Sequence, residues 1–448
     1  MSQTAKDLPT ALRGIAKRAQ REKKHRFGNL YSLLNEQTLY QSYYELNRRA
    51  AVGVDGEDWQ EYGQRLGERL KDLVERLKAG RYRARLIRRK HIPKGGGKTR
   101  PLGIPVTEDK LLQWPAARLL EAIYEADFLN GSWGYRPGRS SKTASRVLAG
   151  RLVIGRYHWI VEADIRGYFE HIDHDWMIRM LEQRVNDRAF LRLIRKWLKA
   201  GVLEEDGKVV DPITGTPQGG VISPILANVY LHYALDLWFE ERVRKQSQGQ
   251  AMLMRYADDF VAAFERREDA EAFLVMLRER LAKFKLELAE DKTRLVRFSR
   301  DDMARNGYFD FLGFRFGWEP TRTGKPHVQR RTSPPRLQRS VAGFTEWIKK
   351  ARHLRMRPLM RRLKPKLTGY WNYYGVIGNF ASLKKFWRQI VRLLFKWLNR
   401  RSHRRSYNWE GFVALLRDFQ VPPPRITEDG TAKVQASQLW LPVLKQRS

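Results

Sequence analysis

The chain of 448 residues contains no cysteine. This absence excludes disulfide bonds, thiol catalysis and zinc modules built on cysteine ligands, and it suits a reducing compartment. No run of about 18 apolar residues occurs, so a membrane-spanning helix is not expected. The first 26 residues lack the apolar core of a secretory signal, and Asp7, Glu22 and the lack of a serine-rich bias argue against an organellar transit peptide.

Acidic residues are scarce relative to basic ones. There are 49 Asp and Glu against 86 Lys and Arg, which gives a formal charge of +37. Such an excess repels itself in isolation and indicates a large polyanionic partner. The basic residues are interleaved with aromatic ones, which favours nucleic acid over a membrane surface. The length predicts two to four modules.

The apolar spacing predicts mostly helices outside one mixed region. Residues 1–50 and 59–77 have helical patterns, residues 85–104 read as a basic hairpin, and a helix is expected over 107–126. Strand and helix signals mix over 157–316, which is typical of an α+β domain. Residues 320–336 contain proline and predict a linker to a basic helical region. The apolar stripe of that region consists of Leu383, Phe386, Trp387, Ile390, Leu394 and Leu398. From Pro422 onward the chain is expected to be irregular.

Two adjacent carboxylates, Asp258 and Asp259, lie between strand-like runs in the segment MRYADDF (residues 254–260), where a hairpin turn is expected. Another strand-like run, residues 157–161, leads to Asp164. Like charges placed together are costly unless a cation compensates them. Three acidic groups at strand ends are what two Mg²⁺ ions need to activate a 3′-hydroxyl and stabilise a leaving pyrophosphate. By itself an Asp-Asp pair is usually a solvated turn.

The ordered set of segments over residues 25–400 resembles the reverse transcriptases and maturases encoded by group II introns. The segments are IPKGGGKTR (92–100), NGSWGYRPGR (130–139), ADIRGYF (163–169), GTPQGGVISP (215–224), MRYADDF, LAEDK (288–292), FLGFRF (311–316) and GYWNYYG (369–375). The resemblance implies an α+β right-hand polymerase with fingers, palm and a helical thumb or maturase domain. The implied parts are an N-terminal extension (1–60), the first part of the fingers (61–110), the palm with the remaining fingers (111–320), the thumb or maturase domain (321–400) and a short basic segment (401–448).

The resemblance assigns the catalytic roles to the three aspartates. Asp164, Asp258 and Asp259 match the family's first, second and third catalytic aspartates; the first two bridge the ions and Asp259 contributes less. The implied metal positions are Asp164, Ile165, Asp258 and Asp259. The implied cofactor is a pair of Mg²⁺ ions, with Mn²⁺ as a substitute, because two-metal catalysis needs carboxylates from separate strands.

The sugar of the incoming nucleotide is expected to lie over an aromatic ring. Phe169 follows Asp164 by five positions, where polymerases of this type place a ring that clashes with a 2′-hydroxyl and selects deoxynucleotides. Tyr168 is the neighbouring candidate, and packing in the palm core is the alternative for both rings.

The resemblance also implies contacts to the rest of the nucleotide. Lys94 and Arg100, on either side of the glycine turn, would neutralise the triphosphate, and Lys98 is a further cation there. A solvated basic hairpin is the alternative. Gln218 resembles the residue that contacts the incoming nucleotide, although its loop also serves as a helix entry.

Further segments resemble those that contact template and primer. In residues 130–139, the two arginines would grip phosphates and the tyrosine would stack, while Gly313 would let the primer end approach. The aromatics of residues 369–375 would stack on RNA or, equally well, form the thumb core. The implied template and primer residues are Tyr135, Arg136, Arg139, Gly313, Tyr370 and Trp371.

Together these features predict an RNA-directed DNA polymerase that binds its intron RNA and aids splicing and retrohoming. The alternatives are a related reverse transcriptase recruited to host defence or repair, and a splicing-only maturase, which the three retained aspartates disfavour. The expected partners are RNA template, group II intron RNA, DNA primer or target and dNTPs, with no membrane and an open oligomeric state. Without Cys pairs after the thumb, the chain resembles the endonuclease-lacking bacterial class, located in the cytoplasm near the nucleoid.

Overall fold

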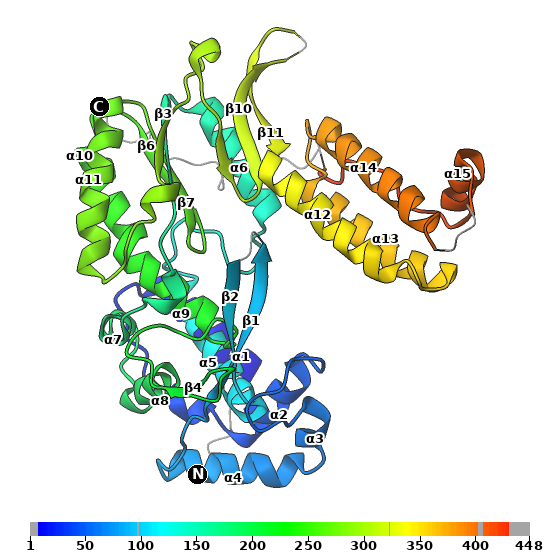
Figure 1. Ribbon diagram of the computed structural model, residues 1–448. Coiled ribbons are helices and arrows are strands. Elements are labelled where there is room, and N and C mark those ends of the chain that lie inside the picture. Colours follow the sequence, from blue (N-terminus) through cyan, green and yellow to red (C-terminus); the bar gives the residue numbers. More distant parts are fainter. Residues whose placement is uncertain (1–7, 96–97, 322, 402–405, 430–448) are drawn as a thin grey trace.

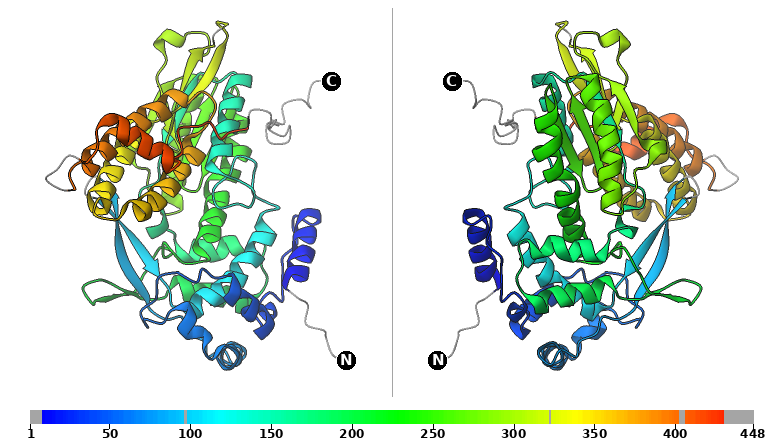
Figure 2. Two further views of the ribbon diagram at one scale, coloured as in Figure 1. Left: turned by 90° about the vertical axis from the view of Figure 1, so that its right-hand side faces the viewer. Right: turned by 90° about the vertical axis from the view of Figure 1, so that its left-hand side faces the viewer.

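The computed structural model describes residues 8–95, 98–321, 323–401 and 406–429. Helices predominate, and the strands form a four-stranded sheet with the order β6-β7-β3-β8, a second four-stranded sheet (β2-β1-β4-β5) and a three-stranded sheet (β11-β10-β9) (Figure 1). The first of these is called the central sheet here. Two further views, each turned by 90° from Figure 1, show helices α12–α15 projecting from one side of the molecule, with α1 on the opposite side (Figure 2).

The N-terminal part combines helices with the predicted basic hairpin. A capping box between Asp58 and Glu61 begins α3, and the buried positions Leu66, Leu70 and Leu73 give α4 the apolar face that its spacing predicted. The elements are α1 (Leu8–Arg21), α2 (Glu36–Glu45), α3 (Trp59–Gly63), α4 (Leu66–Lys78), β1 (Ile87–Gly95), β2 (Lys98–Ile104) and α5 (Thr107–Tyr124). The expected hairpin and the helix after it are thereby confirmed.

The central sheet is covered on both faces, which explains why its strands read as continuous apolar runs. Along β7, Phe260 and Ala262 join the core that contains α11, whereas Val261 and Ala263 join the core that contains α6 and the C-terminal helices. The strands are β3 (Trp159–Ala163), β6 (Ala251–Tyr256), β7 (Asp259–Phe264) and β8 (Arg294–Arg297). The helices in this part are α6 (Ser141–Ile154), α7 (His174–Glu182), α8 (Arg188–Leu198), α9 (Ser223–Leu231), α10 (Arg244–Gln246) and α11 (Arg267–Lys283).

The remaining strands are short or lie beyond the central sheet. The strands β4 (Val202–Leu203) and β5 (Val209–Val210) extend the sheet of the basic hairpin, and β9 (Phe309–Phe311), β10 (Phe314–Pro320) and β11 (Pro326–Thr332) form the third sheet. The predicted linker over 320–336 is therefore wrong: its residues 326–332 form β11 and pair with β10, and α12 begins at Pro334. Val328, Arg330 and Thr332 alternate inward there, a period-two pattern that the prolines and charges obscured.

The C-terminal part is helical, as expected. It consists of α12 (Pro334–Ala351), α13 (Met356–Tyr374), α14 (Phe380–Leu398) and α15 (Trp409–Asp418). The predicted stripe of α14 is buried at Leu383, Phe386, Ile390, Leu394 and Leu398, while Trp387 packs at its edge. The α15 helix was not predicted. Among the described residues no helix is both long and apolar enough to cross a bilayer.

Candidate active site

The pairing of the central strands brings the three aspartates to one end of the sheet. Asp258 lies in the turn of the β6–β7 hairpin, which Tyr256 and Asp259 close as its last pair. Strand β3 pairs with β7 so that Ala163 lies opposite Phe260. Asp164 follows Ala163 and Asp259 precedes Phe260, so in this antiparallel pair the two aspartates are the next residues to face each other. The sequence separated these carboxylates by more than 90 positions; the antiparallel register places them side by side.

The carboxylates influence one another electrostatically. Burial, followed by the negative charges of Asp258 and Asp164, raises the pKa of Asp259 to about 6, although its outer edge is exposed to solvent. The positive charges of Arg336 and Lys292 lower the pKa of Asp259 and partly offset this rise. The arrangement therefore stores repulsion that a bound cation would relieve.

Lys292 already supplies one positive charge at this place. Its Nζ donates a hydrogen bond to Asp164 Oδ2, which raises the pKa of Lys292. The segment before it runs along residues 164–166, with Ala289 N donating to the Asp164 carbonyl (2.8 Å) and Arg166 N to the Glu287 carbonyl (2.9 Å). The LAEDK segment is thus a structural neighbour of the first aspartate.

The donor set fits a divalent cation. Carboxylate oxygens are the ligands that Mg²⁺ prefers, and the ammonium of Lys292 shows that a cation is stable against Asp164. In the described parts of the chain, no three acidic or histidine side chains are already gathered into a complete ligand set. A cation at this site would therefore displace Lys292 and draw the carboxylates closer.

Two cavities meet at Asp164 and Lys292, which line both. The first, of about 360 Å³, lies toward the basic hairpin; its lining includes Arg100, Tyr135, Ile165, Phe169, Gln218 and Asp258. The second, of about 270 Å³, lies toward α12; its lining includes Asp259, Gly313, Arg336 and Arg339. The aspartates therefore separate a space lined by the expected nucleotide residues from one that contains the expected primer glycine.

The structure distinguishes the two candidate aromatic rings. Tyr168 is buried, and its hydroxyl donates to the Ala227 carbonyl at 2.5 Å. Phe169 is half-buried and lines the first cavity. Both residues line the first cavity beside Asp164, but Phe169 is the more exposed of the two, whereas the Tyr168 hydroxyl is already bonded inside the protein.

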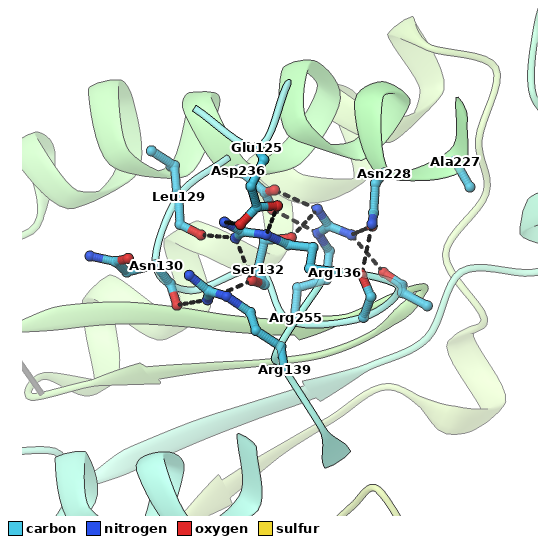
Figure 3. Close-up of polar contacts among 12 residues, drawn as sticks. Glu125, Leu129, Asn130, Ser132, Arg136, Arg139, Ala227, Asn228, Asp236 and Arg255 are labelled. Carbon is cyan, nitrogen blue, oxygen red and sulfur yellow. Dashed lines mark hydrogen bonds and ion pairs between the residues drawn. The ribbon is translucent and has the colours of Figure 1, made fainter. Parts of the chain in front are cut away.

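Arg136 does not face a template, and its expected role is corrected. Its side chain is 3% exposed and binds both carboxylate oxygens of Glu125 (2.9 and 2.7 Å) and the carbonyls of Leu129 and Ser132 (2.8 and 2.7 Å) (Figure 3). Four of its five N–H donors are used within the protein, and its burial separates the side chain from a template phosphate. Arg139 also donates to the Ser132 carbonyl (3.0 Å) but stays partly exposed.

The remaining predicted residues fall into different surroundings. Tyr135 is 49% exposed beside the first cavity, in a left-handed conformation (φ 56°). Trp371 is fully buried and Tyr370 stacks on Phe386 (ring centroids 3.7 Å apart), so stacking on RNA is wrong for Trp371, and the ring of Tyr370 is occupied within the protein. The side chains of Lys94 and Lys98 lie outside the described residues.

A buried arginine that sequence reasoning missed supports the β6–β7 turn, which is the predicted catalytic turn. Arg255 has no exposed side-chain surface and binds both oxygens of Asp236 (2.8 and 2.6 Å), Asn228 Oδ1 (3.0 Å) and Ser132 Oγ (2.7 Å) (Figure 3). It also donates to the carbonyl of Ala257 (2.9 Å), the left-handed residue just before Asp258. In the sequence, the feature that could have indicated this role is a single arginine within the otherwise apolar run of β6.

The same arginine joins the catalytic turn to residues 130–139. Trp133 N donates to the Arg255 carbonyl (2.8 Å), and Asn228 Nδ2 donates to the Gly134 carbonyl (2.7 Å). A Cβ at Gly134 would lie 2.3 Å from Ala257 N, so only glycine permits this approach. The segment therefore contacts the turn directly, through its backbone.

Comparisons with known proteins give a consistent result. A family model described as "Reverse transcriptase (RNA-dependent DNA polymerase)" matches residues 92–316, and one described as "Group II intron, maturase-specific domain" matches residues 337–411. The chain is similar to the group II intron-encoded protein LtrA of Lactococcus lactis (29% identity, 84% of this chain, 75% of that protein) and to protein YkfC of Escherichia coli (31% identity, 67% and 84%). A solved telomerase from Candida albicans covers 80% of this chain and 68% of its own with a TM-score of 0.43 and 14% identity.

The raised pKa of Asp259 predicts a pH-dependent stability difference. In the wild type, unfolding becomes easier as the pH rises from about 4 to about 6, because ionisation of this carboxyl is disfavoured only in the folded state. Asp259→Asn avoids this cost, so its Tm should exceed that of the wild type above about pH 6 and match it near pH 4. Thermal unfolding across this range tests it, with exposed Asp206→Asn as the control; a difference that grows on acidification contradicts the analysis.

The Arg255 contacts predict that its charge alone is insufficient. Arg255→Lys keeps a cation beside Asp236 but cannot make all five hydrogen bonds, so we expect the rate of nucleotide addition to fall at least about tenfold while template affinity changes little. Single-turnover primer extension measures this. Arg267→Lys, which alters an exposed arginine paired with Glu271, is the control. Equal losses in both variants would contradict a positioning role.

Proposed function

The chain belongs to the reverse transcriptases that group II introns encode, and we propose that it copies RNA into DNA by two-metal nucleotidyl transfer at Asp164, Asp258 and Asp259. As a member of that family it is an RNA-directed DNA polymerase with a maturase domain, and it binds RNA. We propose further that this RNA is the parent intron, whose splicing and retrohoming the protein assists.

One observation carries the polymerase proposal. Three carboxylates from two strand pairings lie where two cavities meet, and Asp164 borders both cavities. A nucleotide in the first cavity and a primer end in the second would meet at these carboxylates. This is the geometry that in-line displacement requires, with the attacking and leaving oxygens on opposite sides of the reacting phosphorus.

The chain's own groups suit the cation-holding role. When bound, divalent cations, taken to be Mg²⁺ with Mn²⁺ as a substitute, activate the primer hydroxyl and neutralise the leaving pyrophosphate. Asp164 and Asp258 would hold them, with Asp259 at the primer side. The side chain of Ile165 is buried, so this residue would contribute only its backbone oxygen. Lys292 would release Asp164 as the cation enters, remaining close enough to balance charge.

The first cavity suits a deoxynucleoside triphosphate. Arg100 lies exposed on β2 at the edge of this cavity, where it can neutralise phosphate charge. Gln218 also lines the cavity, and its backbone carbonyl accepts a hydrogen bond from Gly103 N (2.7 Å). Phe169 would lie beneath the sugar. Lys94 on β1 is assigned to the same triphosphate by family resemblance.

The second cavity suits a primer end. Gly313 adopts a left-handed conformation (φ 77°) that favours glycine, and it leaves room beside the carboxylates. Arg336 and Arg339, one turn apart on α12, are exposed and line the same cavity, where they would bind primer phosphates. Tyr135 and Arg139 would contact the template from the first cavity's side.

Removal of one cation ligand should separate synthesis from RNA binding. We expect Asp258→Ala to lower DNA synthesis on an RNA template at least about 1,000-fold, because a carboxylate that holds the cations is lost. RNA affinity should stay within about twofold, because the basic surface is unchanged. Extension of a DNA primer and fluorescence anisotropy with labelled RNA measure the two quantities.

The matched control is Asp206→Ala, an exposed aspartate in the β4–β5 loop, which should leave both quantities unchanged. Synthesis at the wild-type rate by Asp258→Ala would refute the assignment of the site.

The half-buried ring of Phe169 beside the first cavity predicts sugar selectivity. Phe169→Val should raise the ratio of ribonucleotide to deoxynucleotide incorporation by about 10- to 100-fold, since the smaller side chain leaves room for a 2′-hydroxyl. Tyr168→Phe removes only a buried hydroxyl and should leave the ratio unchanged. Competition between the two nucleotide types in primer extension measures it, and an unchanged ratio in Phe169→Val would mean that another group excludes the 2′-hydroxyl.

A further inference from the structure

We propose that residues 421–429, named the C-terminal clasp here, fix the thumb helices α12–α14 against the palm and thereby determine how long the enzyme retains its primer–template. The inference rests on the proposed polymerase function and adds to it a pair of positioning residues, Arg330 and Glu428. Neither residue lines the cavities beside the catalytic aspartates. The clasp joins three parts of the chain that are distant in sequence: α6, β11 and the turn between α13 and α14.

The clasp binds the thumb through its backbone. The amides of Thr427 and Glu428 both donate to the Gly375 carbonyl (2.8 and 2.9 Å), at the end of α13. Thr427 Oγ1 donates to the Trp371 carbonyl (2.9 Å), and Trp371 Nε1 donates to the Pro422 carbonyl (3.1 Å). The buried Trp371 is therefore the residue around which the clasp closes on the thumb.

The clasp binds the rest of the molecule through charged side chains. Arg330 on β11 donates to both oxygens of Glu428 (3.1 and 2.7 Å) and to Ser145 Oγ on α6 (3.1 Å). Lys142, one turn earlier on α6, donates from Nζ to Thr427 Oγ1 (2.8 Å). A single short segment thus connects the helix behind the central sheet with the thumb.

Burial makes the ion pair sensitive to the loss of either partner. The side chains of Arg330 and Glu428 are 8% and 3% exposed. Glu428 Oε2 also accepts from Ile377 N (2.8 Å), in the α13–α14 turn, so its two oxygens serve three donors. Removing one charge leaves the other buried without compensation, which favours opening of the whole contact over partial loosening.

An open clasp would move the thumb without touching the catalytic carboxylates. The second cavity is bounded on one wall by Arg336 and Arg339 of α12, and α12 packs against α14. The first cavity is lined by residues before position 293. We therefore expect an opened clasp to weaken the grip on primer–template while leaving the addition of one nucleotide intact.

The experiment compares product length with single-nucleotide rate in the full chain carrying Glu428→Gln. After primer–template is bound, synthesis is started together with an excess of unlabelled trap, so that each enzyme extends once. The number of nucleotides added per binding event should fall about fivefold or more. The rate of the first addition by pre-bound enzyme should stay within about twofold of the wild type.

Matched variants separate the clasp from a general loss of charge or stability. Glu410→Gln, an exposed glutamate on α15, should behave as the wild type. Arg330→Gln should shorten products as Glu428→Gln does, and the double variant should add nothing further, because both changes break one contact. If Glu428→Gln fails to fold, Thr427→Val, which loses the hydroxyl bonds to Lys142, Trp371 and Gly375 but keeps the backbone bond to Gly375, should show the same shortening.

Because the chain contains no cysteine, labels can be attached at chosen positions to measure where the thumb lies. Labels on cysteines introduced at Arg392 of the thumb and Glu271 of α11 should report a broader distribution of distances in Glu428→Gln than in the wild type. The proposed role of the clasp would be overturned by any of three results in Glu428→Gln: unchanged product length, an unchanged distribution of label distances, or equal losses of product length and first-addition rate. An inactive wild type would instead contradict the proposed polymerase function.

Discussion

The structure depends on holding like charges together at one end of a sheet. The β3–β7 register places Asp164 next to Asp259, and the β6–β7 turn adds Asp258. Their mutual repulsion has to be balanced from elsewhere in the chain. Lys292 does so directly, while Arg255 fixes the backbone of the turn from inside the protein. A cation bound at the proposed site would relieve the same repulsion.

The sequence predicted those features that depend on local patterns. Apolar runs ending in aspartates indicated the strands and the catalytic turn, and the spacing of Leu383, Phe386 and Ile390 indicated the face of α14. It could not reveal partners chosen by the tertiary fold. Arg136 looked like a phosphate contact because its partner, Glu125, is recognisable only in three dimensions. The segment 320–336 suggested a linker because its prolines and charged residues mask the inward alternation of β11.

Three arginines illustrate how one residue type serves different purposes in this highly basic chain. Arg255 and Arg136 are buried and bound to carboxylates and other oxygens of the protein, so they organise the segments around the site. Arg336 is exposed in the cavity near Gly313, where a phosphate could reach it. Burial and partner, more than sequence context, separate structural cations from those available to nucleic acid. The large positive charge of the sequence therefore overstates the number of binding residues.

The central claim is that Asp164 and Asp258 share divalent cations beside a primer end. The most direct measurement is an anomalous-scattering map of crystals of the enzyme grown with Mn²⁺, an RNA–DNA primer–template and a non-hydrolysable dNTP. The account predicts manganese density about 2.1 Å from carboxylate oxygens of both aspartates, with Lys292 moved off Asp164. Manganese bound elsewhere, or a Lys292–Asp164 pair that persists with nucleotide in place, would contradict it.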